Sequence, residues 1–445
     1  MGPLGGFIIK PTSVPGVGPV WLMLLLFVPY AAAYRIVSAN AVPGARRIIG
    51  AFAGLSCLVL IARIIPTASY DLYLYSSQGS QIAQHGLNPY AITPAMAPDI
   101  FTSHMGAFLA NMKAVYGPLW LDIAALASAV TRGDPVALVV ALKMISAAFF
   151  AGCIFLLSVL ADELSPSGAR PALKDGALLL FAWNPAALFE FAGNGHNDVV
   201  MIFFLLLAIL FAVRSRWASA GFAMAASIMV KYVTLLCLPF LLLFAVSGKG
   251  RSLGSRAAAA GSVLFAAAIA AVAAFTPYWI GRATFDGLAH QSGLIGVDVA
   301  SPFVYAAAIS LLGLPDVTMQ QRWDAAAVFA RIVFQAAMFI LVFFAYKKKV
   351  AASDLHRFAF APMIVYLALS CFWLMPWYLT WLAPLFVLEG AAAAAIIVSF
   401  FGFLLYSAVF TGPLLGAAAI AVTVSSLSGR RRGTASAALF SRGAR

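Results

Sequence analysis

The sequence has very few charged residues for its length. Only 10% of its 445 residues are Asp, Glu, Lys or Arg, whereas 63% are hydrophobic. Soluble domains carry about 25% charged residues, so this composition excludes an ordinary soluble domain. The mean hydropathy of +0.97 predicts a polytopic membrane protein, in which residues 1–445 form a single integral membrane domain.

Acidic residues are scarcer than basic ones, with 15 Asp and Glu against 28 Lys and Arg and a formal net charge of +13. In a soluble chain this excess would suggest a nucleic-acid partner. Here the basic residues form short clusters between apolar runs, which is typical of the cytoplasmic ends of membrane spans. We therefore expect membrane lipid around the chain and no nucleic acid as a partner.

The sequence has only four cysteines, and all of them lie within apolar runs: Cys57, Cys153, Cys237 and Cys371. None has a neighbour at metal-ligand spacing, so we expect buried, unreactive thiols. No cluster of His, Asp and Glu in the sequence clearly forms a metal site. We expect no metal ligands and no cofactor, although the sequence leaves a divalent metal open.

The apolar runs and the basic clusters together predict the topology. We place five basic clusters in the cytoplasm: 46–47, 214–216, 249–256, 347–349 and 430–432. The fold class is then an all-α bundle of about 11–13 spans, multi-pass in the inner (cytoplasmic) membrane. The expected spans are 20–38, 48–66, 135–161, 176–192, 198–213, 217–230, 232–246, 257–280, 325–346, 357–375, 377–390, 391–411 and 412–428. Residues 117–131 and 302–314 become non-crossing or re-entrant helices, and 429–445 a basic cytoplasmic tail.

This topology places most of the unusual polar residues on the outer side of the membrane. They lie in the first outer loop at 67–117, the turn at 193–198, Lys231, the segment 281–301 and the turn at 375–378. Polar groups gathered at one face of a helical bundle indicate a cavity open to the aqueous phase and to lipid. We therefore expect a functional site on this side.

The first outer loop begins with an acidic residue at the membrane boundary. Residues 70–90 read YDLYLYSSQGSQIAQHGLNPY, directly after a span that ends at Pro66. Asp71 is therefore held at the boundary, beside Tyr70, whose residue type is typical of interfacial anchors. A juxtamembrane helix with a solvated aspartate explains the same residues, so a site and a plain helix start both stay open.

The same loop carries three glutamines at every third residue, Gln78, Gln81 and Gln84. This spacing predicts one face of an amphipathic surface helix that ends at Gly86.

A second polar cluster lies in FAWNPAALFEFAGNGHNDVVM at 181–201, where Asn-Pro interrupts an apolar run and Glu190 lies near its end. His196, Asn197 and Asp198 then open the next span. Asn and Asp are favoured at helix N-caps, so a capped helix start is one interpretation. Three consecutive polar side chains exceed what a cap needs, which favours a site.

Lys231 lies in an apolar stretch with almost no polar residue for ten positions on either side. A lysine at mid-membrane costs about 2.5–3.5 kcal/mol on insertion scales. The side chain therefore either snorkels to the interface or pairs with an anion, for which a lipid phosphate is the natural candidate.

Aromatic residues cluster in WLMPWY at 373–378, including Trp377 and Tyr378. An aromatic belt at the interface explains them, and so does a stacking platform for a sugar ring or a prenyl chain.

Taken together, these stretches resemble the GT-C superfamily of membrane glycosyltransferases, and in particular the polyprenol-phosphate-mannose-dependent α-(1→6)-mannosyltransferases. The matching pieces, in the order of the family, are SYDLYLY, GLNPY with Asn88 and Tyr90, YGPLWL at 116–121, the NP…GNGHND run at 184–198, the Lys-to-Leu-Pro stretch at 231–239 and PWYLTW at 376–381. They cover about 310 residues. Each piece alone is a weak pattern, whereas six in order with a consistent membrane placement are more specific.

The resemblance implies an inverting transfer of a sugar from a polyprenyl-phosphate donor to a hydroxyl of a glycan or glycolipid acceptor. The position that matches the catalytic base of the family is Asp71. The substrate-binding residues implied or suggested by the motifs are His196, Asn197, Asp198, Lys231, Tyr70, Asn88, Tyr90, Trp377 and Tyr378. Arg282, in a loop that aligns with no family motif, is added as a candidate phosphate ligand on its charge alone.

Two other classes of function stay open at this point. A GT-C enzyme could use another polyprenyl-linked hexose or pentose, because the sequence does not reveal the sugar. A transporter or lipid flippase would explain the hydrophobic bundle, but such proteins are expected to show related halves or paired broken helices, and the sequence shows neither.

Overall fold

The computed structural model describes residues 25–64, 66, 69–164, 171–247, 252–293, 318–371 and 374–406. Within these ranges the chain forms helices and no β-strand, apart from one isolated bridge between Ile280 and Arg282. The predicted all-α class is therefore confirmed.

The longer helices and the short ones that shape the site follow one another along the chain. They are α2 (Phe27–Ala39), α3 (Ala45–Ala62), α4 (Asp71–His85), α5 (Gly106–Ala110), α6 (Pro118–Val130), α7 (Pro135–Leu164), α8 (Pro171–Ala182), α9 (Pro185–Leu188), a π-helical turn η4 (Phe189–Gly193), α10 (Asp198–Val213), α11 (Trp217–Val230), the 3-10 helix η5 (Tyr232–Cys237), α12 (Leu238–Val246), α13 (Leu253–Phe275), α14 (Asp286–Gly293), α16 (Met319–Lys348), α17 (Leu355–Leu369), the 3-10 helix η9 (Pro376–Leu382), α18 (Ala383–Glu389) and α19 (Ala392–Leu404).

Four helical segments are long and apolar enough to cross a membrane: Ala45–Ala62, Pro135–Leu164, Leu253–Tyr278 and Ala327–Lys348. Leu173–Ala182 and Pro185–Gly193 form a fifth span if the pair, bent by 40°, is counted as one. Shorter apolar helices of 10–17 residues include α6, α10, α11 and α19. The chain is a multi-pass membrane protein, and the total of about 11–13 spans stays a prediction.

Some predicted segments can be compared directly with the structure. The expected spans 198–213 and 217–230 coincide with α10 and α11, and the expected non-crossing helix at 117–131 coincides with α6. The predicted helix at 302–314, the span at 412–428 and the tail at 429–445 lie outside the described residues.

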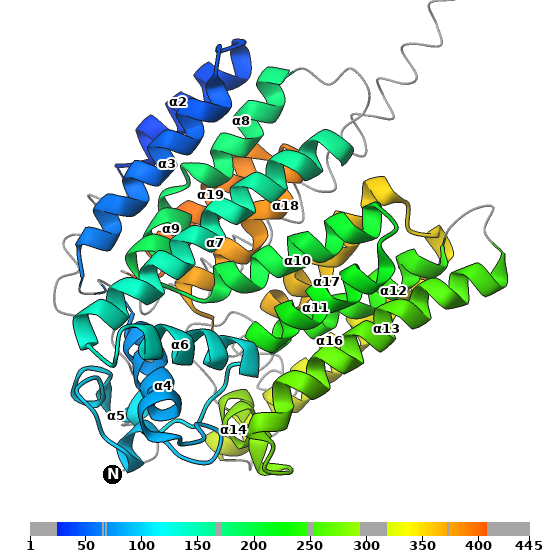
Figure 1. Ribbon diagram of the computed structural model, residues 1–445. Coiled ribbons are helices and arrows are strands. Elements are labelled where there is room, and N and C mark those ends of the chain that lie inside the picture. The colour runs from blue at the N-terminus through cyan, green and yellow to red at the C-terminus, as the bar shows by residue number, and fades with distance from the viewer. Residues whose placement is uncertain are drawn as a thin grey trace, which may run out of the picture.

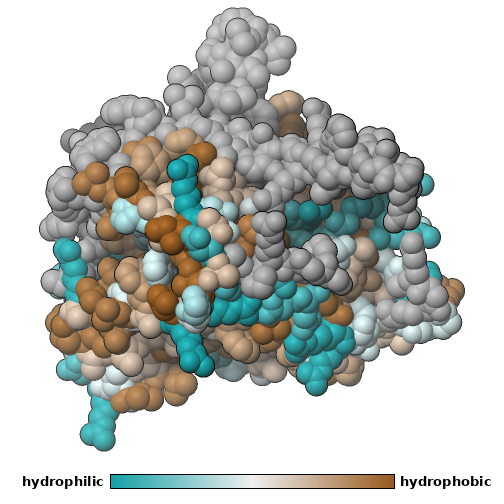
Figure 2. Space-filling model, turned by 90° about the horizontal axis from the view of Figure 1, so that it is seen from above, coloured by the Kyte–Doolittle hydropathy of each residue, from teal (hydrophilic) through white to brown (hydrophobic). Residues whose placement is uncertain are grey.

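Several of the shorter helices gather at one end of the bundle (Figure 1). Figure 1 shows α4, α5, α6 and α14 together at one end of the longer helices. Figure 2, which views the molecule from the other end, shows hydrophilic side chains between hydrophobic ones on that face. Large hydrophobic side chains are exposed along the helices, as expected beside lipid, among them Leu55, Val59, Phe265, Val272, Phe339 and Phe344.

The structure corrects the prediction of a surface helix for α4. The helix ends at Gly86, which has a positive φ of 63°, as predicted. However, Gln78 and Gln81 are each only 1% exposed. The helix packs so closely on α6 that a Cβ at Gly79 would lie 2.5 Å from the carbonyl oxygen of Ala124. The part of its polar face that carries Gln78 and Gln81 is therefore covered by a neighbouring helix, whereas Gln84 is exposed.

Some polar side chains of this helix find hydrogen-bond partners, whereas the buried side-chain amide of Gln78 has none among the described residues. Ser80 and Ser128 share a hydroxyl–hydroxyl bond of 3.3 Å, and Gln84 donates to the carbonyl oxygen of Ser128 at 3.1 Å. Gln81 donates to the carbonyl oxygen of Thr93 at 3.4 Å. These bonds offset the cost of removing the groups from water.

Candidate active site

Asp71 is the first residue of α4, at the end of the bundle where several shorter helices gather. The hydroxyl of Ser69 accepts a hydrogen bond from the Asp71 backbone N–H at 3.1 Å. The carboxylate oxygen Oδ2 accepts from the hydroxyl of Tyr116 at 3.3 Å and from that of Tyr75 at 3.5 Å. The side chain is 15% exposed. Asp71 is therefore enclosed by aromatic residues, and the interpretation as a solvated aspartate is wrong.

The environment of Asp71 makes its carboxylate a stronger base than an ordinary aspartate. Burial raises the pKa of Asp71 to about 6, whereas Lys231 lowers it. The charge of Asp198 acts in the raising direction, and the hydrogen bonds from Tyr116 and Tyr75 act in the lowering direction. At pH 7 the group is still mainly ionised, which suits a general base.

The turn at 193–198 is pressed against the start of α4. Gly195 has a positive φ of 71°, and a Cβ there would lie 2.9 Å from the side chain of Leu72, so the turn requires glycine at this close contact. The hydroxyl of Ser146 donates to the carbonyl oxygen of Gly195 at 3.2 Å and holds the turn from α7. This packing places His196 directly beside Asp71.

His196 lies between two carboxylates. Its Nδ1 is 3.7 Å from Oδ2 of Asp71, and its Nε2 is 3.4 Å from Oε2 of Glu190. The imidazole stacks on Trp377 with a centroid distance of 4.0 Å. The side chain is fully buried, and burial lowers the pKa of His196 well below its usual value, with Lys231 acting in the same direction. The ring is therefore neutral at pH 7.

Glu190 is fixed by residues that are distant in the sequence. Its Oε1 accepts a hydrogen bond from the hydroxyl of Tyr406 at 2.7 Å, and its Oε2 accepts from the side-chain amide of Asn194 at 2.9 Å. Both bonds are buried, so the carboxylate has a defined position against the edge of the His196 ring.

Asp198 and Lys231 form a buried ion pair. Lys231 donates to Oδ1 of Asp198 at 2.7 Å, and the indole N–H of Trp381 donates to the same oxygen at 2.5 Å. The Lys231 ammonium also lies 4.4 Å from the centroid of the Tyr378 ring. The anion that pairs with Lys231 in this structure is thus a protein carboxylate, where the sequence suggested a lipid phosphate.

The helix-cap interpretation of this turn is wrong. The N-cap of α10 is Asn197, and its side chain makes no capping hydrogen bond. Its side-chain oxygen instead accepts from the hydroxyl of Tyr75 at 3.3 Å. Asp198 is the first helical residue and bonds to Lys231 and Trp381. These side chains therefore connect α10 to the site.

The aromatic residues of η9 lie inside the bundle. Trp377 is 6% exposed, Tyr378 is 7% exposed and Trp381 is 1% exposed. Tyr378 and Trp381 stack on each other at 4.4 Å. This burial contradicts the aromatic-belt interpretation, because belt residues face lipid and interfacial water. Their role as a platform for a sugar or a prenyl chain stays a prediction.

Asn88 and Tyr90 support the loop behind Asp71. The amide of Asn88 donates to the carbonyl oxygen of Tyr278 at 2.9 Å and accepts from the backbone N–H of Tyr90 at 3.0 Å. The Tyr90 hydroxyl donates to the carbonyl oxygen of Tyr116 at 2.7 Å. Their nearest link to the carboxylate therefore passes through Tyr116, and direct substrate binding by either residue stays a prediction.

The remaining two predicted residues lie at the margin of this arrangement. Tyr70 is half-buried and stacks on Tyr73 at 6.4 Å. Arg282 is exposed, and in the described part of the chain no side-chain hydrogen bond or ion pair joins it to the residues around Asp71. The structure brings together Asp71, His196, Asn197, Asp198, Lys231, Trp377 and Tyr378, and not Arg282.

Sequence reasoning missed several residues of the site. Tyr75 lies one helical turn after Asp71, so the i,i+4 spacing could have identified it. Tyr116 belongs to the YGPLWL motif and was not singled out within it. Tyr406 approaches from the C-terminal third of the chain, and no local pattern links it to Glu190. Trp381 belongs to the predicted aromatic cluster, but its hydrogen bond to Asp198 was not predicted.

The described residues contain no group of three or more His, Cys, Asp or Glu side chains that could hold a metal ion. Asp71 and Glu190 face opposite nitrogens of the His196 ring, so these three side chains do not converge on one point. The expectation of no metal and no cofactor stays a prediction.

The part of the chain that contains the enclosed carboxylate of Asp71 matches a known protein family. Residues 17–247, just over half of the chain, match the family described as alpha-(1→6)-mannopyranosyltransferase, N-terminal domain. The chain belongs to this family, and the resemblance inferred from the motifs is confirmed. The matched region contains Asp71, the turn at 193–198 and Lys231.

Individual relatives agree with the family. The chain is 26% identical over 177 residues to alpha-(1→6)-mannopyranosyltransferase A of Mycobacterium tuberculosis, covering 40% of this chain and 33% of the relative. It is 29% identical over 176 residues to alpha-(1→6)-mannopyranosyltransferase A of Corynebacterium glutamicum, covering 39% and 34%. The similarity thus spans about a third of each relative's length. The oligosaccharyltransferase of Archaeoglobus fulgidus aligns with a TM-score of 0.37 and 14% identity over 86% of this chain and 53% of that one, a likeness too weak to carry an argument.

Proposed function

We propose that the protein is an inverting glycosyltransferase of GT-C type. It transfers a sugar, which family membership suggests is mannose, from a polyprenyl-phosphate donor to a hydroxyl of a glycan or glycolipid acceptor at the outer face of the cytoplasmic membrane. The observation that supports this proposal best is the state of the Asp71 carboxylate. It is enclosed, its pKa is raised, and the described residues form hydrogen bonds to only one of its oxygens.

The two oxygens of Asp71 have different surroundings. Both tyrosine hydroxyls donate to Oδ2, and the Nδ1 of His196 approaches the same atom. Among the described residues no hydrogen bond reaches Oδ1. Oδ2 is therefore the oxygen that fixes the orientation of the carboxylate, and Oδ1 is the oxygen that can receive a proton from a substrate hydroxyl.

The proposed step is a single displacement at the anomeric carbon. The acceptor hydroxyl gives its proton to Oδ1 of Asp71, its oxygen forms the new glycosidic bond, and the bond between the sugar and the lipid phosphate breaks with the electron pair leaving on the phosphate. The leaving group is an anion, so a nearby cation stabilises the transition state. Lys231 is the cation of this site, and its side chain is 14% exposed although Asp198 already pairs with it.

The test is transfer of labelled mannose from a polyprenyl-phosphate mannose to a panel of mannoside acceptors by the purified full chain. Asp71→Asn keeps the size of the side chain and removes its basicity, so we expect turnover to fall at least about 100-fold with donor binding retained. A matched control is Asp286→Asn, an exposed carboxylate in α14 that forms an ion pair with Lys113. This control should keep normal turnover.

The outcomes separate the functional classes. Near-normal turnover by Asp71→Asn would contradict the assignment of the base. Transfer from another polyprenyl-phosphate sugar, with none from the mannose donor, would identify a different substrate for the same chemistry. Movement of lipid across the membrane without any transfer would indicate a flippase.

A further inference from the structure

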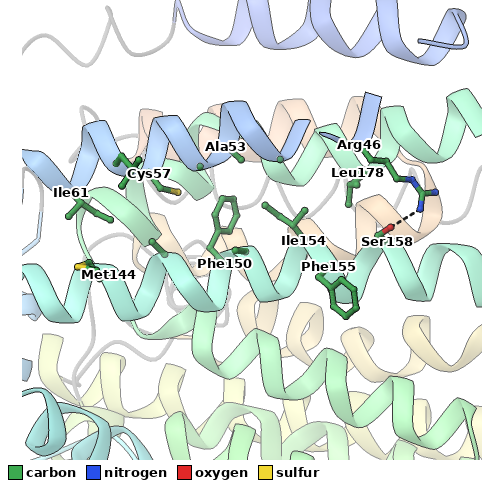
Figure 3. Close-up of a pocket in the computed structure, with 15 residues that line it drawn as sticks. Arg46, Ala53, Cys57, Ile61, Met144, Phe150, Ile154, Phe155, Ser158 and Leu178 are labelled. Carbon is green, nitrogen blue, oxygen red and sulfur yellow. Dashed lines mark hydrogen bonds between the residues drawn. The ribbon is translucent and has the colours of Figure 1, made fainter. Parts of the chain in front are cut away.

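A groove of about 610 Å³ runs between α3 and α7, away from the aromatic residues around Asp71. Figure 3 shows its two walls, with Cys57 and Ile61 on α3 facing Met144, Phe150 and Ile154 on α7. Almost all of its lining is apolar, and Arg46 and Ser158 are its polar residues. Such a lining suits a hydrocarbon chain.

The groove opens toward the lipid. Leu58 on α3 and Phe155 on α7 both line it, and each is 66% exposed. The two helices are among those long and apolar enough to cross the membrane. A lipid chain can therefore enter from the side without passing through water.

Two glycines on α3 leave this groove wide. A Cβ added at Gly50 or Gly54 would meet no other atom within 4 Å. By contrast, a Cβ at Gly152 on α7 would lie 2.7 Å from the ring of Phe203. Gly152 is thus required for helix packing inside the chain, whereas Gly50 and Gly54 face empty space that another molecule can fill.

The spacing Gly-x-x-x-Gly is also typical of helix–helix association in membranes. Here both glycines line the groove together with Phe150 and Ala151 of the same chain. The glycine surface is therefore turned toward α7 of its own molecule. This orientation favours a thin hydrocarbon chain over the α3 helix of a second copy.

The inner end of the groove does not suit an anion. Arg46 lies there, and it donates to Asp175 at 2.9 Å, to Asp162 at 3.0 Å and to Ser158 at 2.9 Å. Two carboxylates thus compensate the charge of the guanidinium. Lys174 also donates to Asp162 at 3.2 Å, so the charges of this cluster of two cations and two carboxylates are already balanced without a phosphate.

The outer end of the groove is different. Its last lining residues are Ile61 and Met144. Next to Met144 along α7 is Lys143, whose ammonium donates to the carbonyl oxygen of Arg63 at 2.5 Å. Within the described ranges no carboxylate pairs with Lys143. Lys143 is itself buried and does not line the groove, so its charge favours an anionic headgroup near this end only from behind the lining residues.

The outer end also adjoins the candidate active site. A Cβ at Gly195 would lie 3.4 Å from Cγ of Lys143, so the lysine side chain packs against the turn that holds His196. Ser146, one turn further along α7, bonds to the same glycine. The outer end of the groove and the base Asp71 are thus separated by one tight turn.

We infer that the groove between α3 and α7 binds the polyprenyl chain of the lipid-phosphate sugar donor, with the phosphate beyond its outer end, on the side of the turn that holds His196. This inference rests on the proposed function and adds the place of the lipid chain. From Gly50 to Ile61 the helix rises about 17 Å, roughly half of a hydrocarbon core of about 30 Å. The groove therefore holds the part of the chain nearest the phosphate, and donors with very short chains fill little of it.

The experiment compares a long-chain and a short-chain polyprenyl-phosphate mannose as donors for the full chain. Wild-type protein should show a lower KM for the long-chain donor. Gly54→Leu fills the groove, so we expect it to raise the KM of the long-chain donor about tenfold or more, because each buried methylene that is lost weakens binding. The KM of the short-chain donor should change by less than about twofold on the same reasoning.

A matched control is Gly261→Leu in α13. Gly261 is exposed, and a Cβ there also meets nothing within 4 Å, but it lies outside the groove. This variant should behave as wild type with both donors. Equal effects of Gly54→Leu on both donors, or no effect on either, would overturn the inference while transfer itself continues.

The other outcomes are equally decisive. Loss of a dimer in Gly54→Leu with unchanged KM values would mean that the glycines serve association between copies. Absence of transfer by the wild type with either donor would contradict the proposed function, independently of the groove. If Gly54→Leu fails to fold, long-chain polyprenyl phosphate should still protect Cys57, which lines the groove, from an apolar thiol reagent in the wild type. Equal labelling of Cys57 with and without the lipid would overturn the inference.

Discussion

Replacement of Asp198 by asparagine tests the centre of the site, because this one residue accepts hydrogen bonds from both Lys231 and Trp381. Asp198 is fully buried, and the Lys231 side chain is 14% exposed. Removal of one partner from a buried ion pair costs about 3–5 kcal/mol, since the other charge is left without compensation. The ammonium retains some solvent and the face of Tyr378, so we expect a loss of about 3 kcal/mol, at the low end of this range.

The assay is thermal unfolding of the purified protein in detergent, arranged as a double-mutant cycle. Asp198→Asn and Lys231→Met should each lower the melting temperature. The double variant should lose less stability than the sum of the two, with a coupling of about 2 kcal/mol or more. A nearly silent Asp198→Asn, or additive losses, would refute the ion-pair reasoning.

Donor affinity measured on the same variants distinguishes two roles at this pair. If Lys231 binds the donor phosphate, Lys231→Met should weaken donor binding. Asp198→Asn should not, because it removes a competing anion. If the Asp198 carboxylate itself binds sugar hydroxyls, Asp198→Asn should cost roughly 1–3 kcal/mol of binding or transition-state stabilisation. Full activity and full stability of Asp198→Asn would remove the residue from the site.

Three further predictions follow from the geometry. Because Asp71 must be ionised to act and its pKa lies near 6, kcat/KM should fall about tenfold per pH unit below pH 6. Tyr116→Phe removes a hydrogen-bond donor that lowers this pKa, so the acidic limb of the pH profile should move to higher pH by about half a unit or more. An acidic limb that does not move would contradict the role of this hydrogen bond. Gly117→Ala should lower stability by about 1–3 kcal/mol and reduce turnover, because its Cβ would collide with the backbone of α11; wild-type melting and activity would contradict this contact. In a cysteine-free background, a cysteine that replaces the exposed Ser103 should react with an impermeant thiol probe in intact cells. A cysteine that replaces the exposed Arg47 should react only after the cells are permeabilised. The reverse labelling pattern would contradict the predicted orientation of the chain in the membrane.

The topology test uses Ser103 because the structure shows that α4 is not a surface helix. A cysteine at Ser80 would be the natural probe if α4 were a surface helix. In the structure Ser80 is 7% exposed and bonds to Ser128, so a probe could not reach it. Ser426, adjacent to the predicted tail, lies outside the described residues. Ser103 and Arg47 are both exposed.

Charge and hydropathy patterns were sufficient to predict much of the helical framework. The bounds of α10 and α11 follow from the sequence, because Arg214 and Arg216 interrupt one long apolar stretch and Lys231 ends it. The Asn-Pro pair at 184–185 marks the bend between α8 and α9, where the side chain of Asn184 accepts from two backbone N–H groups. Residues close together in the sequence determine these features, so the sequence predicts them.

The partner of Lys231 can also be predicted from the sequence. Two apolar helices of similar length joined by a short basic turn return the chain to the side from which it started, so the first residue of α10 and the residue after α11 lie close together. The predicted spans therefore place Asp198 beside Lys231, where the apolar surroundings of the lysine alone suggest a lipid phosphate as its partner. The stacking of Trp377 on His196 had no such local signal, since it depends on how η9 packs against the rest of the bundle.

The misplacement of the glutamine face has a physical reason that extends to the whole bundle. Periodic polar residues indicate the exposed face of a helix when the surroundings are water. In a bundle surrounded by lipid the outer surface is apolar, and polar side chains lie where other helices can satisfy their hydrogen bonds. Gln78 and Gln81 on α4 are buried like Glu190 beside His196. Gln81 and Glu190 have hydrogen-bond partners there, whereas the side-chain amide of Gln78 has none among the described residues. Polar periodicity in such a sequence therefore indicates the inner face, and on α4 that face begins with Asp71.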